Sequence, residues 1–318
     1  MIIQNLYTHE KIEPANLLPP VSENRRVSVV MATLGGVTVA RTIAALNCGT
    51  LIPEEILICI PEEFKCRVEK LPYPNVRVVA TLCRGQVVQR AIGFQQASYD
   101  LVLQLDDDIE VRHDCLEKLV DCILEVDNIA VAPKMLDAST GRYHASLTPT
   151  FHTNPLFRQL MFWIVNGPEG YMPGKIGRAG IGMGLPEQPD DWFDIGWLPG
   201  GCVLHRKKNL VLFNYYSLKG KAFSEDLFHS ALLRRKGIRL VRCGRAICDV
   251  DFSPDIASGI LDILKGYRAY AIALRQFIKE NGGVPVFLYL YLIFNLSGIV
   301  IRKLSILIRH RIDVVRKA

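Results

Sequence analysis

Short apolar segments alternate with helical segments early in the chain, and this alternation limits the folds that are open to it. Val27–Thr33 is a β-branched run that ends in a turn at Gly35-Gly36, and Val37–Leu46 has helical spacing. Further apolar strands are expected at Glu55–Ile60, Val76–Ala80 and Asp100–Leu105. One more helix is expected at Gly85–Ala97. Strands that alternate with helices form right-handed βαβ units, so we expect an α/β fold with a mainly parallel sheet flanked by helices.

Three consecutive aspartates, Asp106, Asp107 and Asp108, close the last of these strands. Ligands of parallel sheets bind beyond the carboxyl ends of the strands. Adjacent carboxylates repel one another unless a cation neutralises them, and oxygen ligands suit Mg²⁺ or Mn²⁺, which in turn binds a diphosphate. The alternative is a solvated acidic turn that caps the helix beginning near His113. The position at the end of a buried strand favours the metal site.

In residues 136–195 the apolar residues show little helical or strand periodicity, and a regular pattern resumes after them. Glycine and proline are frequent from Gly167 to Pro189, which predicts a long loop or insertion. Trp197 then precedes Gly200-Gly201 and an apolar strand. This arrangement indicates backbone close to a ligand, with an aromatic wall for a sugar ring. A tight turn into a core strand explains the same residues without a ligand.

A helix is expected directly after Ser224. Ser224 is a good N-cap residue, Glu225 and Asp226 fall in the first turn, bases fall in the last turn, and Gly237 ends the helix. This placement explains both acids as helix-capping charges. A catalytic role for them therefore needs a further argument.

The net charge of +6 belongs mainly to the C-terminus. Residues 302–318 contain six bases against one acid, so the rest of the chain is nearly neutral and nucleic-acid binding is not expected. The preceding Val284–Ile301 has 18 residues without a charge, at the lower limit for a spanning helix. Because bases beyond such a span would oppose the positive-inside tendency, we expect re-entrant or surface-lying helices on anionic lipid. A buried core helix or a dimer interface is the alternative.

The N-terminal sequence and the cysteines indicate the cellular compartment of the protein. Met1–Glu23 lacks the apolar core of a secretory signal. The nine cysteines have irregular spacings and no CxxC pair, which is typical of reduced cytosolic thiols. We therefore expect a peripheral or monotopic protein on the cytoplasmic side of the inner (plasma) membrane.

Five segments, in this order, resemble the family 2 glycosyltransferases, whose nucleotide-sugar-binding fold is of the GT-A type. They are Val27–Gly36, Arg84–Ala97, Leu103–Val111, Trp197–Lys207 and Ser224–Leu240. The resemblance implies a bacterial enzyme with an N-terminal extension (1–25), a GT-A domain (26–250) and C-terminal membrane-associating helices (251–318). The QxxRW element of processive synthases is missing after Asp226, so one sugar is expected per encounter.

The resemblance also implies roles for particular residues. Asp106 and Asp108 would form the DxD metal pair, with Asp108 in direct contact with Mg²⁺ or Mn²⁺. The donor-binding residues would be Thr33, Glu62, Arg84, Asp106 and Asp107, and the acceptor side would contain Trp197, Gly200 and Gly201. Asp226, beside Glu225, would be the catalytic base. Many relatives carry an Asp at the end of the second strand, and Glu62 is the expected substitute here, which leaves the nucleotide in doubt.

The function implied is inverting transfer of one sugar from a nucleotide sugar, most simply a UDP-sugar, to a saccharide acceptor. An acceptor on a polyprenyl lipid, as in envelope polysaccharide assembly, would suit the C-terminal helices. A sugar nucleotidyltransferase is one alternative, but the Arg-containing, Gly-rich loop expected after its first strand is missing. A non-catalytic, membrane-bound sugar-binding protein is the other, and it would be expected to lose one of the acidic motifs.

Overall fold

The computed structural model describes residues 23–68, 70–141, 155–184, 192–251 and 260–299. The N-terminal extension up to residue 22 and the basic segment 302–318 lie outside the described residues. The predictions made for those two segments therefore stay predictions.

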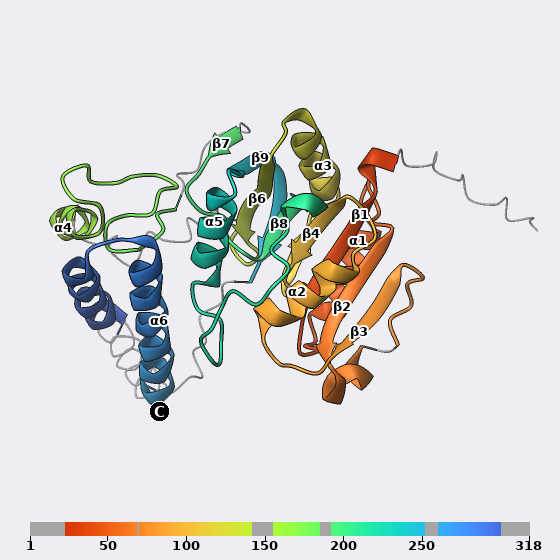
Figure 1. Cartoon of the computed structure of the whole chain (residues 1–318), viewed down its shortest axis with the longest axis horizontal. Coiled ribbons are helices and arrows are strands. Elements are labelled where there is room, and N and C mark those ends of the chain that lie inside the picture. The colour runs from red at the N-terminus through yellow and green to blue at the C-terminus, as the bar shows by residue number, and fades with distance from the viewer. Residues whose placement is uncertain (1–22, 69, 142–154, 185–191, 252–259, 300–318) are drawn as a thin grey trace, which may run out of the picture.

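The first half of the chain alternates strands and helices as expected (Figure 1). Its elements are η1 (Glu23–Arg25), β1 (Val27–Ala32), α1 (Val39–Asn47), β2 (Glu55–Pro61), η2 (Glu62–Arg67), β3 (Val76–Thr81), α2 (Gln86–Gln96), β4 (Leu101–Leu105), β5 (Ile109–Val111), α3 (Cys115–Glu125) and β6 (Ile129–Asp137). The second half contains α4 (Pro155–Asn166), β7 (Trp192–Asp194), β8 (Cys202–Arg206), η4 (Lys207–Asn209), α5 (Glu225–Arg235), β9 (Arg239–Val250) and α6 (Ile260–Asn281). Residues 285–299 form one more helix.

The described strands form one nine-stranded sheet in the order β3-β2-β1-β4-β8-β6-β9-β5, with β7 paired to β9. The strands β3, β2, β1 and β4 are mutually parallel, which confirms the βαβ prediction for this half. The strand β8 runs antiparallel to both β4 and β6, so the other half of the sheet is mixed. The carboxyl end of β4 therefore lies beside the start of β8, at the centre of the sheet.

Helices cover both faces of the sheet, and a hydrophobic core lies on each face. Successive residues of a strand point alternately into these two cores. Val29, Ile58 and Leu103 belong to the face covered by α1 and α3, whereas Val30 and Leu57 belong to the face covered by α2. A Cβ at Gly93 of α2 would lie 2.5 Å from Val30 and from the Cys59 sulfur. This glycine thus permits the close approach of α2 to the sheet, which sets the position of the side chains that α2 directs toward the end of β4.

The loop expected at Gly167–Pro189 is described over residues 167–184, which contain no helix or strand beyond an isolated bridge between Ile176 and Gly182. It is flanked by β7 and by α4, which begins at Pro155, a residue suited to a first helical position. One prediction for the second half is wrong in detail. Ser224 precedes α5 in a left-handed conformation (φ 54°) and its side chain makes no capping hydrogen bond. The end of α5 is as predicted, since Gly237 follows with φ 74°.

The C-terminal helices pack on the outer side of α5, at the end of the molecule opposite β3 (Figure 1). Their shared core includes Phe228 of α5, Phe277 of α6 and Leu292 of helix 285–299. Among the described residues, no helix has the length and apolar character needed to span a membrane. The apolar stretch from Val284 is thus partly buried: Leu288 is 1% exposed and Ile293 is 62% exposed.

Candidate functional site

One arginine joins the two acidic motifs. Arg90 lies on α2 with its side chain 2% exposed, between the end of β4 and the start of α5. Its guanidinium binds Asp106 Oδ1 at 2.6 Å and also pairs with Glu225 Oε1. Gln86, one turn earlier on α2, donates to the same Asp106 oxygen at 3.0 Å. The structure therefore brings the aspartate run and the Glu225-Asp226 pair into one site.

Two acids of this site, Asp226 and Asp106, have pKa values above the ordinary value of a carboxyl group. Burial raises the pKa of Asp226 to about 7, and the neighbouring Glu225 carboxylate raises it further. Burial likewise raises the pKa of Asp106 to about 6, although Arg90 opposes the shift. Burial alone would lower the pKa of Arg90, but Glu225 and Asp106 outweigh it and hold this pKa above its ordinary value. Asp226 can therefore exchange a proton near neutral pH, which suits a general base.

Glu225 and Asp226 do more than cap α5. The Glu225 side chain is buried, and its second oxygen accepts a hydrogen bond from the Tyr215 hydroxyl at 2.6 Å. Arg90 and Tyr215 thus fix both carboxylate oxygens of Glu225. A buried carboxylate held in this way positions the residue beside it, so the capping explanation from the sequence does not account for the pair.

Gly200 and Gly201 lie between the two acidic motifs. A Cβ at Gly200 would come 2.7 Å from Glu225 Oε1, and a Cβ at Gly201 would come 2.5 Å from Ile109 Cδ1 and 3.4 Å from Asp106 Oδ2. The Gly201 carbonyl accepts the Asp106 amide hydrogen bond at 2.7 Å, and the Gly200 carbonyl accepts from Gln104. Both glycines are therefore required by the space between the motifs, which is consistent with the proposed place of the acceptor side.

The three aspartates have different surroundings. Asp107 turns toward β1 and accepts a hydrogen bond from the Thr33 hydroxyl, and its carbonyl accepts from Thr42 at 2.9 Å. Asp106 is one-quarter exposed and Asp108 is exposed. Because Arg90 and Gln86 occupy Oδ1 of Asp106, the oxygens best placed to reach a cation are Oδ2 of Asp106 and the carboxylate of Asp108.

These two carboxylates fit a divalent cation that takes its remaining ligands from water and phosphate. Mg²⁺ is commonly held by one or two carboxylates together with substrate phosphates. Within the described ranges, no group of three or more His, Cys, Asp or Glu side chains converges to form a complete metal cage. The protein would therefore supply only part of the coordination.

The expected nucleotide end of the site lies at the edge of the parallel strands. Glu62 is exposed at the start of η2, directly after β2. Arg84 donates to Glu63 at 2.7 Å and stacks 4.6 Å from the centre of the Phe64 ring. It also lines a cavity of about 290 Å³ that includes Gln86, the partner of Asp106. The prediction that Arg84 lies near the donor is thus compatible with its position.

The aromatic wall expected at Trp197 is wrong. Trp197 is 5% exposed, and its indole N–H donates to the Met183 carbonyl at 3.1 Å. A Cβ at Gly182 would lie 2.6 Å from the indole ring, so this ring packs in the core shared with the C-terminal helices. The core-strand explanation, which the sequence left open for this segment, holds for Trp197.

Comparison with known proteins agrees with this geometry. The model of the family described as "Glycosyl transferase family 2" matches residues 63–176, which include Arg90 and the three aspartates. This part of the chain is therefore similar to the family 2 glycosyltransferases. The pair Glu225-Asp226 lies beyond the matched residues, and Arg90 ties it to them. No curated protein matches the sequence.

Comparison with solved structures bears on the fold. A structure of GalNAc-T7 with UDP, GalNAc and Mn²⁺ superposes with a TM-score of 0.55 and 16% identity, covering 84% of this chain and 48% of the other. Staphylococcus aureus TarS reaches a TM-score of 0.44 with 15% identity, over 80% of this chain and 43% of the other. The chain thus spans about half the length of these proteins, and the first comparison confirms the expected GT-A fold.

Several residues of the candidate site were missed by the sequence interpretation. Arg90 is the main one, and its only signal was a charged residue on the apolar face of the Gly85–Ala97 helix. Tyr215 gave no signal, because it lies in an irregular segment before Ser224. Behind Arg90, His205 is fully buried, and neither ring nitrogen has a hydrogen-bond partner in the described part of the chain. Burial lowers the pKa of this histidine, so the imidazole stays neutral beside Arg90.

Proposed function

We propose that this protein is an inverting glycosyltransferase that moves one sugar from a nucleotide-sugar donor, a UDP-sugar, to a saccharide acceptor. The observation that carries the proposal is the double contact of Arg90 with Asp106 and Glu225. In this proposal the aspartate run is the phosphate side and Glu225-Asp226 is the proton-accepting side, and Gly200-Gly201 lies between them. An in-line displacement at a sugar carbon needs this arrangement, with leaving group and nucleophile on opposite faces.

Asp226 is the proposed general base. It takes the proton of the acceptor hydroxyl while that oxygen forms a bond to the anomeric carbon and the bond to the nucleoside diphosphate breaks, which inverts the configuration. Arg90 and Tyr215 hold Glu225, and Glu225 in turn raises the pKa of Asp226 toward the working pH.

Asp106 and Asp108 are the proposed ligands of Mg²⁺ or Mn²⁺, with Asp108 in direct contact. When bound, the cation neutralises the charge of the departing diphosphate. The Mn²⁺ and UDP in the GalNAc-T7 structure support this choice of cofactor and donor. Thr33, Glu62, Arg84 and Asp107 remain proposed donor contacts, because they line the strand ends next to the metal pair.

The proposed acceptor is a saccharide carried on a polyprenyl lipid in envelope polysaccharide assembly, on the cytoplasmic side of the plasma membrane. The bases of residues 302–318 and the apolar segment before them support a membrane location. The division into an extension (1–25), a GT-A domain (26–250) and C-terminal helices (251–318) is part of this proposal.

The experiment that tests the proposal uses the full chain and a panel of nucleotide sugars with Mn²⁺. A UDP-sugar should raise the melting temperature, since a ligand at 100 times its Kd adds about 2.7 kcal/mol of stability. The selected donor should then yield UDP and a glycoside of inverted configuration, seen by nuclear magnetic resonance. Formation of a nucleotide sugar from a sugar phosphate and a nucleoside triphosphate would instead show a nucleotidyltransferase. Stabilisation without any turnover would show a sugar-binding protein.

A further inference from the structure

The exposed side of α6 mixes large aliphatic and basic side chains. Leu261, Leu264 and Ile272 are 72%, 40% and 46% exposed. Four bases lie on the same side of the helix at intervals of three, seven and four residues, namely Lys265, Arg268, Arg275 and Lys279. Two acids, Asp262 and Glu280, adjoin this row, so positive charge dominates it. A helix face turned only toward water would not place leucine and isoleucine among its charges.

A groove runs between this row and the next helix. It has a volume of about 540 Å³, and its walls are Ile272, Arg275 and Lys279 of α6 with Pro285, Leu288 and Tyr289 of helix 285–299. Tyr289 is 47% exposed, and Val286 and Ile293 extend the exposed apolar row along the second helix. The two helices therefore present one continuous surface, apolar at its floor and basic along one rim.

This combination selects the chemistry of the partner. A soluble phosphate or sugar phosphate would be held by the bases but would gain nothing from exposed leucine, isoleucine and valine. An amphiphile with an anionic headgroup uses both, because its chains cover the aliphatic side chains while its phosphate meets arginine and lysine. The stems of Arg275 and Lys279 can lie along the apolar wall with their charges at the level of the headgroups.

We infer that the outer face of α6 and helix 285–299 docks on a bilayer surface that contains anionic lipid, with Arg275 and Lys279 on headgroup phosphates and Ile272 and Tyr289 at the acyl boundary. These residues differ from the bases of residues 302–318. The inference rests on the membrane location proposed above and deepens it by naming the residues in contact. None of them belongs to the proposed transfer site around Arg90, so vesicle binding can fail while transfer is retained.

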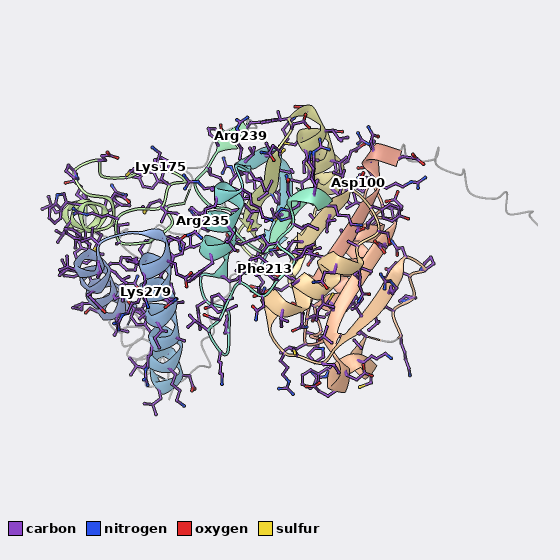
Figure 2. The ribbon with its side chains drawn as sticks, in the orientation of Figure 1. Asp100, Lys175, Phe213, Arg235, Arg239 and Lys279 are labelled. Atoms are coloured by element: carbon purple, nitrogen blue, oxygen red, sulfur yellow. The ribbon has the colours of Figure 1, made fainter. Side chains whose placement is uncertain are left out.

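The test is sedimentation of the full chain with vesicles of phosphatidylcholine alone or with phosphatidylglycerol added at about 30 mol%, which makes the vesicle surface negative. Each base near an anionic surface contributes about fivefold to partitioning. The doubly substituted Arg275→Gln, Lys279→Gln protein should therefore bind the anionic vesicles at least about tenfold more weakly. A matched control replaces Lys207 and Lys208, two exposed bases next to β8, and should bind as the unchanged protein does. Figure 2 shows Lys279 in the left part of the view and Asp100 in the right part, and the backbone amide of Lys207 donates to the Asp100 carbonyl at 2.7 Å.

A second variant tests the apolar part of the surface. Ile272→Ser combined with Tyr289→Ser should also weaken binding, and transfer to a soluble acceptor should be unchanged in both variants. Substitutions are preferable to truncation, because helix 285–299 contributes Leu288 and Leu292 to a shared core. Equal binding of both vesicle types, or undiminished binding of the Arg275→Gln, Lys279→Gln protein, would overturn the inference. So would a dimer in solution that the Ile272→Ser, Tyr289→Ser substitutions dissociate, since the surface would then belong to a second copy of the chain.

Discussion

Asp106, at the carboxyl end of β4, and Glu225, at the first residue of α5, are bound by one guanidinium. The two carboxylates come from opposite halves of the chain and are joined inside the protein by Arg90, which is 2% exposed. Their separation in the fold is therefore set by the span of a planar, five-donor group, which holds two carboxylates with little freedom. This relationship makes the aspartate run and the Glu225-Asp226 pair a single structural unit.

Replacing Arg90 should damage both stability and transfer. An Arg90→Met protein leaves two buried carboxylates without their partner, which typically costs about 3–5 kcal/mol. Arg90→Lys keeps the positive charge but loses the planar guanidinium that binds two carboxylates at once. We therefore expect a smaller loss of stability and still a large loss of kcat. Thermal unfolding and transfer assays would measure both effects, with the exposed Arg77→Lys as the control. Normal transfer by Arg90→Lys would show that the bridge does not position the acids.

The pH dependence of transfer should report Asp226. Its pKa is raised to about 7 by burial, so the carboxylate is protonated below that pH and cannot accept the acceptor proton. The value of kcat/KM should rise with pH and level off above about 7. Asp226→Asn should reduce kcat by at least about 100-fold, the range of general-base contributions, while donor binding persists. A rate that stays constant from about pH 5 to about pH 8 would argue against this base.

The raised pKa of Asp226 also affects stability. A rise in pH should favour transfer but should lower the free energy of unfolding. Because the pKa of Asp226 is higher in the folded protein than its ordinary value of 3.8, the folded state binds more protons than the unfolded state between about pH 4 and pH 7. Stability from this group is therefore present at low pH and lost as pH rises toward 7. At pH 8, Asp226→Asn should raise the free energy of unfolding by about 1–2 kcal/mol. Denaturant unfolding would show it, and a destabilised variant would mean that the charge is well solvated.

Gly200 is expected to tolerate no side chain. The added methyl of Gly200→Ala would meet Glu225 Oε1 at 2.7 Å, and Glu225 is held by Arg90 and Tyr215. We expect a loss of about 1–3 kcal/mol in stability and a fall in kcat larger than the change in donor affinity. Gly266→Ala on α6 is the control, since its methyl has only Phe223 at 3.8 Å and alanine favours helix. Equal behaviour of the two variants would remove the steric argument.

The dependence on metal should distinguish Asp108 from an aspartate that does not bind the cation. Chelation by EDTA should abolish transfer, and added Mn²⁺ should restore it. In Asp108→Asn, the Mn²⁺ concentration that gives half of the UDP-dependent rise in melting temperature should increase at least tenfold, which corresponds to about 1.4 kcal/mol. Asp100→Asn, an exposed substitution at the other end of β4, should leave it unchanged. Transfer that survives EDTA would exclude a required metal.

Local patterns in the sequence predict the parallel half of the fold well. The buried runs at β1, β2 and β4 and the aspartates after β4 follow from alternation and position along single elements. The mixed half could not be predicted, because the antiparallel place of β8 between β4 and β6 depends on long-range pairing. Arg90 was overlooked for the same reason: its two partners lie on other elements, and a lone arginine in a helix gives no sign of them. Trp197 was misassigned because aromatic residues serve cores as often as ligands.

Phe228, two residues after the proposed base, packs edge-on against Phe277 of α6, with ring centres 5.3 Å apart. The helix α5, which begins at the proposed catalytic acids, is thus held against the C-terminal helices. A fragment that stops near residue 250 would uncover Leu227 and Phe228, which belong to the core shared with those helices. The C-terminal helices accordingly support the proposed reaction centre, and this support would be needed even if the protein worked far from any lipid.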